Sequence, residues 1–338
     1  MCLNQRMTNR QVLLVSRPTG EPTRDNFKLI ESPIAPLAEG QLLVRHHYLS
    51  LDPYMRGRMN DAKSYAPPQP LNDVMIGGTA GEVVESRNPS FKPGDLVVGM
   101  GGWQEYSVVS GGVRKVETSR IPLPAYLGPV GMPGVTAWYG LNKICEAKAG
   151  HTIAVSAASG AVGSVVGQLA KAKGCRAVGF AGGPDKCRYV IDELGFDACI
   201  DYKAHADGKS LYAALKVATP DGIDGHFENV GGPVLDAVLL RMNDHARIAL
   251  CGMISGYNGD PIPMKFPSVL LTSRLRIEGF IVSEHMDIWP AALTELGTLV
   301  ATGKLKYRET IANGLDAAPE AFFGMLKGKN FGKQLVKL

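Results

Sequence analysis

Apolar and polar positions follow two different patterns along the chain. From Arg10 to about Ser119, short apolar runs such as QVLLVS, QLLVRHHYLSL, AGEVVES and DLVVGM are separated by Pro and Gly clusters. This pattern is typical of a β-rich, barrel-like domain. From about Gly131 to about Gly303, strand-like runs alternate with helical patterns instead. The alternation predicts a doubly wound parallel sheet.

The expected strands of this second region are TIAVSA, RAVGF, ACIDY, GHFENV, ARIALCG and LRIEGFIVS. The tail from Tyr307 to Leu338 returns to short elements, with a helix over residues 318–327 and a terminal strand GKQLVKL. We expect this tail to rejoin the first domain. We therefore predict one domain from residues 1–130 and 304–338, and a second from residues 131–303.

The stretch TIAVSAASGAVG, residues 152–163, leads from an apolar strand through a turn of small residues into a helix. Backbone amides of such a turn approach a pyrophosphate only where Cβ atoms are absent or small, and the helix N-terminus favours the same anion. Gly160 and Gly163 provide this access, but Ala158 replaces the first glycine of the G-x-G-x-x-G fingerprint. A helix over residues 162–173 and a strand over residues 176–180 complete a βαβ unit, so we expect a dinucleotide site here.

The residues after the second strand favour NADP over NAD. An NAD site usually has Asp or Glu about 20 residues after the glycines, where it binds the ribose 2′-hydroxyl. This chain has Gly183 there, followed by Lys186 and Arg188, so the pocket looks open and basic. Two alternatives stay open: the cations could be solvated residues at a helix start, or Asp185 could take the acidic role.

Composition is that of a soluble enzyme. The chain has 338 residues, of which 45% are apolar and 20% charged, and its formal net charge is +4. This length provides enough core for two domains. Because Lys and Arg are scattered, we expect neither a nucleic-acid partner nor a membrane surface.

The cysteines and apolar runs bear on the cellular compartment. Wide spacing without a C-x-x-C motif predicts reduced thiols in a cytoplasmic protein. The run VLLV at residues 12–15 is too short for a signal peptide. Residues 152–170 carry no charge and contain Gly163-x-x-x-Gly167, but they are too polar for a membrane helix. The six cysteines are Cys2, Cys145, Cys175, Cys187, Cys199 and Cys251.

Short-chain dehydrogenases are one rival class. Two Y-x-x-x-K matches occur, Tyr139 with Lys143 and Tyr212 with Lys216. That class carries its tyrosine well downstream of an N-terminal fingerprint, whereas the first match precedes the glycine turn and the second follows it too closely. We attribute both matches to chance.

Zinc alcohol dehydrogenases are the more serious rival because they share this domain order. They need thiolate, imidazole and carboxylate ligands that converge on one ion. Gly78 and Thr79 stand where such enzymes carry His and Glu, and no four-cysteine lobe exists. His46 and His47 are adjacent on a predicted strand and face opposite sides, so we expect no metal site.

Seven blocks occur in order from residue 50 to residue 333: SLDPYMRGRM, GMPGVTAWYGL, AASGAVG, LGFDACIDYK, FENVGG, CGMISGYN and LKGKNFGK. Together they resemble the zinc-independent medium-chain dehydrogenase/reductases, in the leukotriene dehydrogenase, prostaglandin reductase and alkenal double-bond reductase group. The resemblance implies an α/β protein with a GroES-like catalytic domain and a Rossmann domain, usually a homodimer. It also implies reduction of the carbon–carbon double bond of an enone or enal with NADPH.

The resemblance assigns cofactor contacts residue by residue. Lys186 and Tyr202 are assigned to the adenosine 2′-phosphate, Asn229 to the ribose region, and Asn330 reaches in from the tail. The residues assigned to the pyrophosphate turn are Ala158, Ser159, Gly160, Val162 and Gly163. Those assigned to the nicotinamide are Cys251, Ile254, Ser255, Tyr257, Asn258, Phe280, Ile281 and Val282.

Some of these assignments have structural alternatives. Asn229 could cap a turn before Gly231, and Phe280 could be a core residue. Relatives often continue the 280s strand with Tyr-Arg, where this chain has Ser283 and Glu284. The fit of a substrate near this segment therefore stays open.

Reduction of an enone needs a hydrogen-bond donor for the negative charge that develops on oxygen, and without a metal a tyrosine hydroxyl suits this role. Tyr257, in the loop after a sheet strand, is the first candidate for enolate stabiliser or proton source. Tyr54 is the second candidate and Tyr65 the third; a structural role for Tyr257 stays open. A zinc-free quinone reductase and a non-catalytic NADPH-binding protein are the alternative functions.

Overall fold

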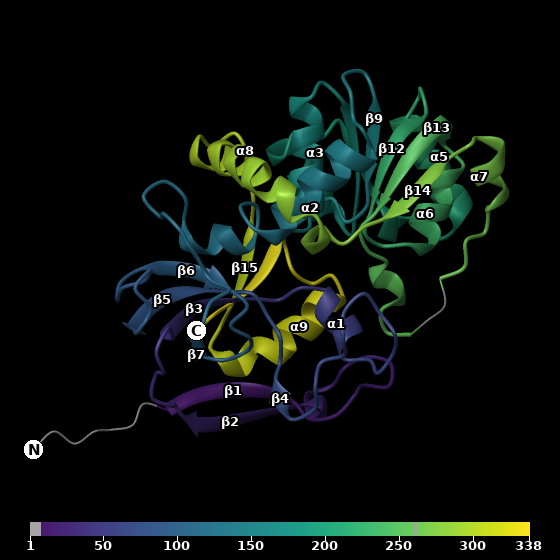
Figure 1. Ribbon diagram of the computed structural model, residues 1–338. Coiled ribbons are helices and arrows are strands. Elements are labelled where there is room, and N and C mark those ends of the chain that lie inside the picture. Colours follow the sequence, from purple (N-terminus) through teal and green to yellow (C-terminus); the bar gives the residue numbers. More distant parts are fainter. Residues whose placement is uncertain (1–7, 260–261) are drawn as a thin grey trace, which may run out of the picture. The chain divides into compact units, whose positions relative to one another are not determined.

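The computed structural model describes residues 8–259 and 262–338, so Cys2 lies outside the described residues. The chain divides into two compact units (Figure 1). Unit 1 comprises the chain up to Leu127, Glu309–Asn330 and Gln334–Leu338, and unit 2 comprises Gly128–Arg308 and Phe331–Lys333. Residues 128–130, 304–308 and 331–333 thus belong to unit 2, although the sequence pattern placed them with the first domain.

Unit 2 is built around a six-stranded parallel sheet with the strand order β11-β10-β9-β12-β13-β14. This is the doubly wound arrangement that the alternating pattern predicts, with its switch point between β9 and β12. The strands are β9 (Thr152–Val155), β10 (Arg176–Ala181), β11 (Ala198–Asp201), β12 (Ile223–Glu228), β13 (Met242–Leu250) and β14 (Arg276–Gly279).

Helices cover both faces of this sheet, so its central strands are buried on both sides (Figure 1). One face packs on α2, α3 and α8, and the other on α5 and α6. The helices of unit 2 are α2 (Met132–Tyr139), α3 (Gly163–Ala172), α4 (Pro184–Arg188), α5 (Gly208–Ala218), α6 (Gly232–Leu239), α7 (Ser268–Thr272) and α8 (Trp289–Ala301).

The last predicted strand of unit 2 is shorter than its apolar run. The pattern LRIEGFIVS extends to Ser283, but β14 ends at Gly279. Its parallel partner β13 ends at Leu250, which pairs with Gly279, so no further ladder is available. Phe280 and the residues after it therefore leave the sheet.

Unit 1 contains a three-stranded sheet, β2-β1-β4, and a seven-stranded sheet, β15-β16-β3-β5-β6-β8, in which β7 also pairs with β3. Its helices are α1 (Tyr54–Arg58) and α9 (Ala318–Leu326). Its strands are β1 (Thr8–Leu14), β2 (Phe27–Pro33), β3 (Leu42–Ser50), β4 (Asp73–Val74), β5 (Thr79–Ser86), β6 (Leu96–Gly99), β7 (Tyr106–Val109), β8 (Arg114–Lys115), β15 (Glu309–Asn313) and β16 (Lys333–Lys337).

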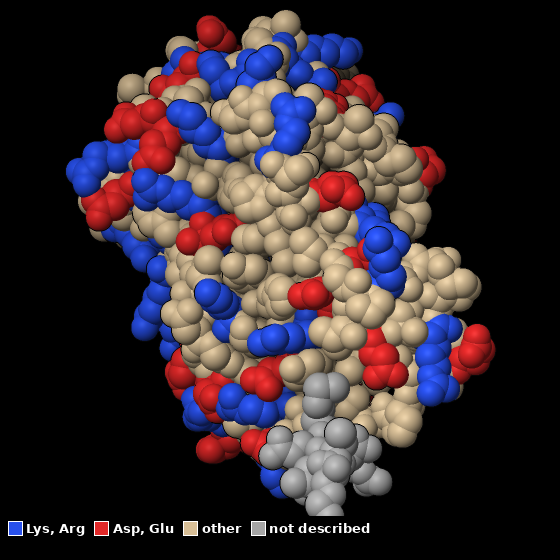
Figure 2. Space-filling model, turned by 90° about the vertical axis from the view of Figure 1, so that its left-hand side faces the viewer, with Lys and Arg blue, Asp and Glu red and all other residues tan. Residues whose placement is uncertain are grey.

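The uncharged segment 152–170 forms β9, a turn and most of α3 rather than one long helix. Within the described residues, no helix combines the length and the apolar character needed to cross a membrane. Figure 2 shows Lys and Arg side chains interspersed with Asp and Glu over the face that it draws. This agrees with the scattered charges of the sequence.

Candidate cofactor and active site

The turn between β9 and α3 is closed by its own backbone. Ala157 has a φ of 50°, and its carbonyl oxygen accepts a hydrogen bond from the amide of Gly160 at 2.9 Å. A Cβ at Gly163 would lie 2.4 Å from this oxygen, and one at Gly160 would lie 3.1 Å from it. Both positions therefore favour glycine, which leaves the backbone open at the N-terminus of α3.

The replacement of the first fingerprint glycine is compatible with this turn. The left-handed residue is Ala157, so position 158 needs no glycine for its conformation. Ala158 is buried, and its amide donates to the carbonyl oxygen of Phe180 at 2.9 Å. A Cβ built at Gly179 would lie 2.7 Å from the Ala158 methyl group. The chain thus has alanine at position 158 on the turn, and glycine at position 179 on β10 leaves room for its methyl group.

The end of β12 is tied to the same turn. The side-chain amide of Asn229 donates to the carbonyl oxygen of Ser156 at 2.8 Å, and the backbone amide of Asn229 donates to the Ser156 hydroxyl at 2.7 Å. The Ser156 hydroxyl donates to Glu228 at 2.6 Å. Asn229 therefore bridges the two strands that border the switch point. It does not use its side chain to cap the turn at Gly231.

Glu228 is a buried carboxylate at the centre of this network. It accepts hydrogen bonds from the amides of Val230 at 2.6 Å and Gly231 at 3.1 Å, and its other oxygen lies 3.0 Å from Nε2 of His226. Burial alone would raise the pKa of Glu228, but the charge of His226 and these hydrogen bonds outweigh it and lower the pKa. The network fixes the loop that follows β12.

A basic site lies at the end of β10, where the chain turns at Gly182 and Gly183. A Cβ at Gly182 would lie 2.8 Å from the Tyr202 hydroxyl and 2.9 Å from Cε of Lys203. Burial lowers the pKa of the Lys186 ammonium, and the nearby charge of Lys203 lowers it further. Two ammonium groups and a phenol hydroxyl therefore surround this turn, a combination suited to an anion.

The acidic residues near this turn already form hydrogen bonds or an ion pair within the protein. Asp201 accepts a hydrogen bond from the Gly183 amide at 2.8 Å and from the Lys203 amide at 3.1 Å. Exposed Asp185 forms an ion pair with Arg188, so Arg188 is directed to this carboxylate. This pairing supports neither the acidic role for Asp185 nor a phosphate contact of Arg188.

Residues 331–333 lie against the turn between β9 and α3. The amide of Gly332 donates to the carbonyl oxygen of Ser159 at 3.1 Å, and Gly332 forms a parallel bridge with Gly160. The guanidinium of Arg308 lies 5.0 Å from the centre of the Phe331 ring. It forms an ion pair with Glu193 as well. Arg308 thus holds this segment in place. Asn330, which precedes it, belongs to unit 1.

Tyr257 lies in the loop after β13, at the carboxyl end of the sheet. This loop is bound to the end of β12, since the amide of Ile254 donates to the carbonyl oxygen of Asn229 at 3.1 Å. The Tyr257 hydroxyl accepts a hydrogen bond from the Met253 amide at 3.4 Å. A Cβ at Gly252 would lie 3.0 Å from this hydroxyl, so Gly252 leaves room for it.

The segment after β14 packs mainly as core. The Phe280 ring lies 5.4 Å from that of Tyr139 and 6.2 Å from that of Phe227. Val282 is buried, and its carbonyl oxygen accepts a hydrogen bond from the Trp289 indole at 3.1 Å. The core alternative for Phe280 therefore fits its contacts, and a cofactor contact of residues 280–282 stays a prediction.

The other two candidate tyrosines, Tyr54 and Tyr65, lie near each other in unit 1. Tyr54 is the first residue of α1 and is partly buried, whereas Tyr65 is 56% exposed. Burial raises the pKa of the Tyr54 phenol, and Asp52 and Tyr65 raise it further. Tyr54 is thus held in the protonated form that a proton donor needs.

The two adjacent histidines of β3 have different surroundings. His46 is buried, and within the described residues neither ring nitrogen has a hydrogen-bond partner. Burial lowers the pKa of His46 to about 3, with a smaller contribution from His47. His47 is partly exposed and lies 3.8 Å from Glu82. Among residues 8–259 and 262–338, no three His, Cys, Asp or Glu side chains gather as metal ligands.

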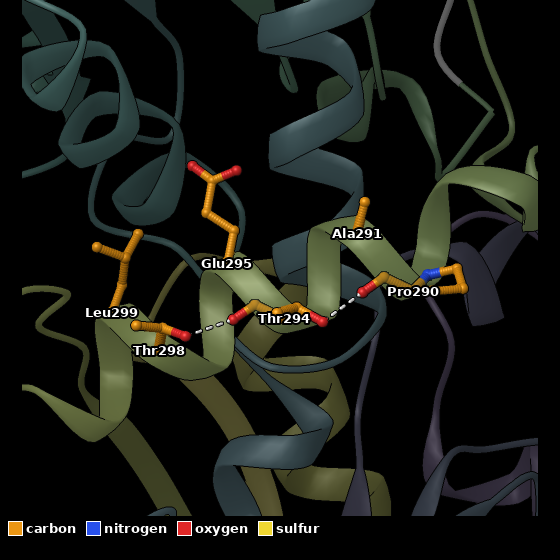
Figure 3. A pocket seen from close by; sticks show the side chains of 6 residues that line it. All are labelled: Pro290, Ala291, Thr294, Glu295, Thr298 and Leu299. Atoms are coloured by element: carbon orange, nitrogen blue, oxygen red, sulfur yellow. Dashed lines mark hydrogen bonds between the residues drawn. The ribbon is translucent and has the colours of Figure 1, made fainter.

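A shallow depression of about 540 Å³ lies on α8 (Figure 3). The Thr294 and Thr298 hydroxyls on it donate to carbonyl oxygens of their own helix at 2.8 Å. These hydroxyl groups are therefore directed to the helix rather than to a ligand, and the residues that line the depression all lie on α8. Its lining residues are Pro290, Ala291, Thr294, Glu295, Thr298 and Leu299.

Three residues of this site were missed by sequence reasoning. Lys203 follows Tyr202 in the block LGFDACIDYK, and its position after a strand end was a usable signal. Glu228 precedes Asn229 in FENVGG, but nothing in the pattern shows that it is buried. Arg308 acts through long-range contacts to Phe331, which no local pattern indicates.

Two family models match the chain. One, described as the N-terminal domain of oxidoreductase, matches residues 10–116. The other, described as zinc-binding dehydrogenase, matches residues 161–298.

Individual proteins match over nearly the whole length. The chain is 46% identical over 342 residues to NADPH-dependent curcumin reductase of Escherichia coli (strain K12). This match covers 99% of this chain and 98% of that protein. It is 42% identical over 343 residues to 2-alkenal reductase (NADP(+)-dependent) of Nicotiana tabacum, with 98% of each chain covered. The crystal structure of CurA in complex with NADPH from Vibrio vulnificus matches with a TM-score of 0.92 and 45% identity, and covers 97% of this chain and 98% of that one.

Proposed function

The chain belongs to the medium-chain dehydrogenase/reductases, in the group that includes curcumin, prostaglandin and alkenal reductases, and we propose that it reduces the carbon–carbon double bond of α,β-unsaturated ketones and aldehydes with NADPH. The motif resemblance is confirmed by the family matches. The names of the relatives support the use of NADPH and the substrate class.

One observation in unit 2 carries the cofactor assignment. Lys186 and Lys203 come close enough to lower the pKa of Lys186, and both lie by a turn that has Gly183 instead of an acidic residue. A 2′-phosphate would relieve the repulsion between the two ammonium groups, whereas a ribose hydroxyl would not. The residues present therefore fit NADPH, and we assign Lys186, Lys203 and Tyr202 to its 2′-phosphate.

The rest of the cofactor fits the carboxyl ends of the strands. We assign Ala158–Gly160, Val162 and Gly163 to the pyrophosphate, because the turn exposes backbone there and α3 begins there. Asn229 and the loop from Cys251 to Asn258 follow the neighbouring strands, so they would border the ribose and nicotinamide. Residues 280–282 and Asn330 are assigned on the family resemblance alone.

Bound NADPH supplies a hydride for the β carbon of the substrate. The chain's own task is to stabilise the negative charge that then develops on the carbonyl oxygen and to deliver a proton to the α carbon. We propose Tyr257 as the first donor, Tyr54 as the second and Tyr65 as the third. The raised pKa of Tyr54 means that its hydroxyl stays protonated well above neutral pH and can donate a hydrogen bond to the oxygen.

Turnover of a substrate panel tests this function. With NADPH, a linear enone, a 2-alkenal and curcumin should each give the product that gains two hydrogen atoms across the double bond, as measured by mass spectrometry. A benzoquinone serves as the comparison acceptor. Turnover of the quinone alone would indicate a quinone reductase, and NADPH binding without turnover of any acceptor would indicate a non-catalytic protein.

The oligomeric state, the compartment and the partners are also proposals, the first from the family resemblance and the others from the cysteine spacing and the scattered charges. We propose a homodimer in the cytoplasm, with a small-molecule substrate and no nucleic-acid or membrane partner. Sedimentation equilibrium of the purified protein tests the oligomeric state.

A further inference from the structure

Two cysteines of unit 2 lie next to each other beside the basic turn. The sulfur atoms of Cys187 and Cys199 are 3.4 Å apart, and both thiols are reduced. Cys187 lies on α4, one residue after Lys186, and Cys199 lies on β11, three residues before Tyr202. The pair therefore connects the two elements that carry the candidate phosphate ligands.

The fold brings the two thiols together through neighbouring strands. Cys199 pairs with Gly179 in the parallel ladder between β11 and β10. After β10 the chain turns at Gly182 and Gly183, and the amide of Cys187 donates to the carbonyl oxygen of Gly183 at 3.2 Å. Cys187 is buried, with 8% of its surface exposed, whereas Cys199 is partly exposed.

The hydrogen bond between the thiols makes them chemically unequal. The Cys199 thiol donates to the Cys187 sulfur, which lowers the pKa of Cys187 against the effect of burial. In contrast, burial raises the pKa of Cys145 and that of Cys251 to about 12. The thiolate is the reactive form of cysteine, so Cys187 is the nucleophile of this set and Cys199 lies within reach to resolve it.

We propose that Cys187 and Cys199 form a peroxide-responsive thiol pair that closes to a disulfide and weakens NADPH binding at the adjacent basic turn. The Cys187 thiolate attacks one oxygen of hydrogen peroxide, the O–O bond breaks, and a sulfenic acid and hydroxide form. The Cys199 sulfur then attacks the Cys187 sulfur, the S–S bond forms, and water leaves. In total, two thiols and one hydrogen peroxide give one disulfide and two water molecules.

Closure brings the Cys187 sulfur on α4 closer to the Cys199 sulfur on β11, and the proposal takes α4 to shift with it. A disulfide has an S–S length of about 2.05 Å, so the sulfur separation must shorten by about 1.4 Å. The segment before α4 contains Gly182 and Gly183, which can absorb this change. Because Lys186 directly precedes Cys187, the movement displaces the ammonium from its position by the phosphate. This coupling rests on the proposed function, whereas formation of the disulfide does not.

The first experiment measures the disulfide itself in the full-length protein. After treatment with hydrogen peroxide and removal of the excess, the intact mass should fall by two hydrogen atoms, and peptide mapping should link residue 187 to residue 199. Cys187→Ser and Cys199→Ser should each abolish the link, while Cys175→Ser, the control in another buried site, should retain it. Oxidation that stops at Cys187 as sulfinic acid, or a link between other cysteines, overturns the proposal.

The second experiment measures the coupling. In the oxidised protein the Kd for NADPH should rise about 5- to 10-fold, with recovery after dithiothreitol, while the Kd for NADH changes less than about 2-fold. An unchanged NADPH Kd in protein whose disulfide is verified overturns the coupling. Failure of the reduced protein to bind NADPH at all would instead contradict the proposed function. The two failures can be told apart because the mass measurement of the disulfide does not depend on the cofactor.

Discussion

Ser156 and Asn229 hold each other through two hydrogen bonds: the Asn229 amide group donates to the Ser156 carbonyl oxygen, and the Ser156 hydroxyl accepts from the Asn229 backbone. The two residues follow β9 and β12, the strands on either side of the switch point. Their pairing fixes the separation of the strand ends where a dinucleotide would cross the sheet.

Asn229→Ala should therefore weaken cofactor binding. It leaves the carbonyl oxygen of Ser156 without its side-chain donor, which costs about 1 to 3 kcal/mol. We expect the NADPH Kd to rise about tenfold, measured by fluorescence titration. Asn243→Ala is the control, since its amide binds Asp221 and Asp224 instead. An equal loss of NADPH affinity in both variants would show a general loss of folding rather than a local effect.

Lys186→Ala and Lys203→Ala should each reduce the preference for NADPH. A charge-assisted hydrogen bond to the 2′-phosphate contributes about 1.5 to 3 kcal/mol, so the NADPH Kd should rise at least about tenfold while the NADH Kd is retained. Titration of both cofactors measures the ratio. Lys171→Ala, whose ammonium pairs with Asp197, is the matched control. A parental NADPH-to-NADH ratio in the Lys203 variant would remove that residue from the site.

Tyr257→Phe should lower kcat for enone reduction by about 10²- to 10³-fold, as loss of one preorganised donor does. NADPH affinity should change little because the ring is retained. Steady-state kinetics of Tyr257→Phe, Tyr54→Phe and the double variant identify the donor, and Tyr212→Phe on α5 is the control. Near-parental kcat in all three variants, with hydride transfer limiting turnover, would exclude tyrosine donation.

His46 should make the protein less stable in mild acid. Its folded-state pKa of about 3 is below the ordinary value of 6.5, so its contribution is fully present above pH 6.5 and is lost as the pH falls towards 3. At pH 4.5 the loss relative to pH 7 is about 2 to 3 kcal/mol. Urea unfolding of the parent and of His46→Leu at both pH values checks this. The parent should lose more stability than the variant; equal losses would contradict the low pKa.

Activity should not depend on a bound zinc ion. Gly78 and Thr79 replace the ligands of zinc alcohol dehydrogenases, and the described cysteines and histidines do not converge as a ligand set. Dialysis against a strong chelator should leave turnover unchanged, with metal content followed by mass spectrometry. Loss of one zinc per chain together with turnover would show that this expectation is wrong.

Local sequence patterns predicted the elements of unit 2 well because its strands are short, apolar and separated by turns. The helix expected over 162–173 is α3 at Gly163–Ala172, and the strand RAVGF is part of β10. In unit 1 the patterns did not single out β2 and β7. These strands are partly exposed, so they lack the continuous apolar runs that identify buried strands.

The candidate site likewise contains some residues that local sequence patterns predict and others that they do not. The glycine turn and Lys186 could be predicted because phosphate binding needs specific residue types at fixed spacing, and their contacts with the cofactor stay predictions. Val282 has a buried side chain because its segment leaves the sheet after Gly279 and packs on the core, and its assignment to the nicotinamide stays a prediction. The contact between Gly332 and Gly160 joins residues that are far apart in sequence, so no local pattern predicts it.

The place of residues 331–333 has a consequence for the order of events during synthesis. A ribosome that has completed Arg308 has synthesised every strand of the parallel sheet. The segment that lies against Ser159 and Gly160 emerges only after Glu309–Asn330, which belong to the other unit. The turn between β9 and α3 is therefore completed only after all strands of the sheet have been synthesised, and a chain that ended at residue 308 would lack the segment that packs against this turn.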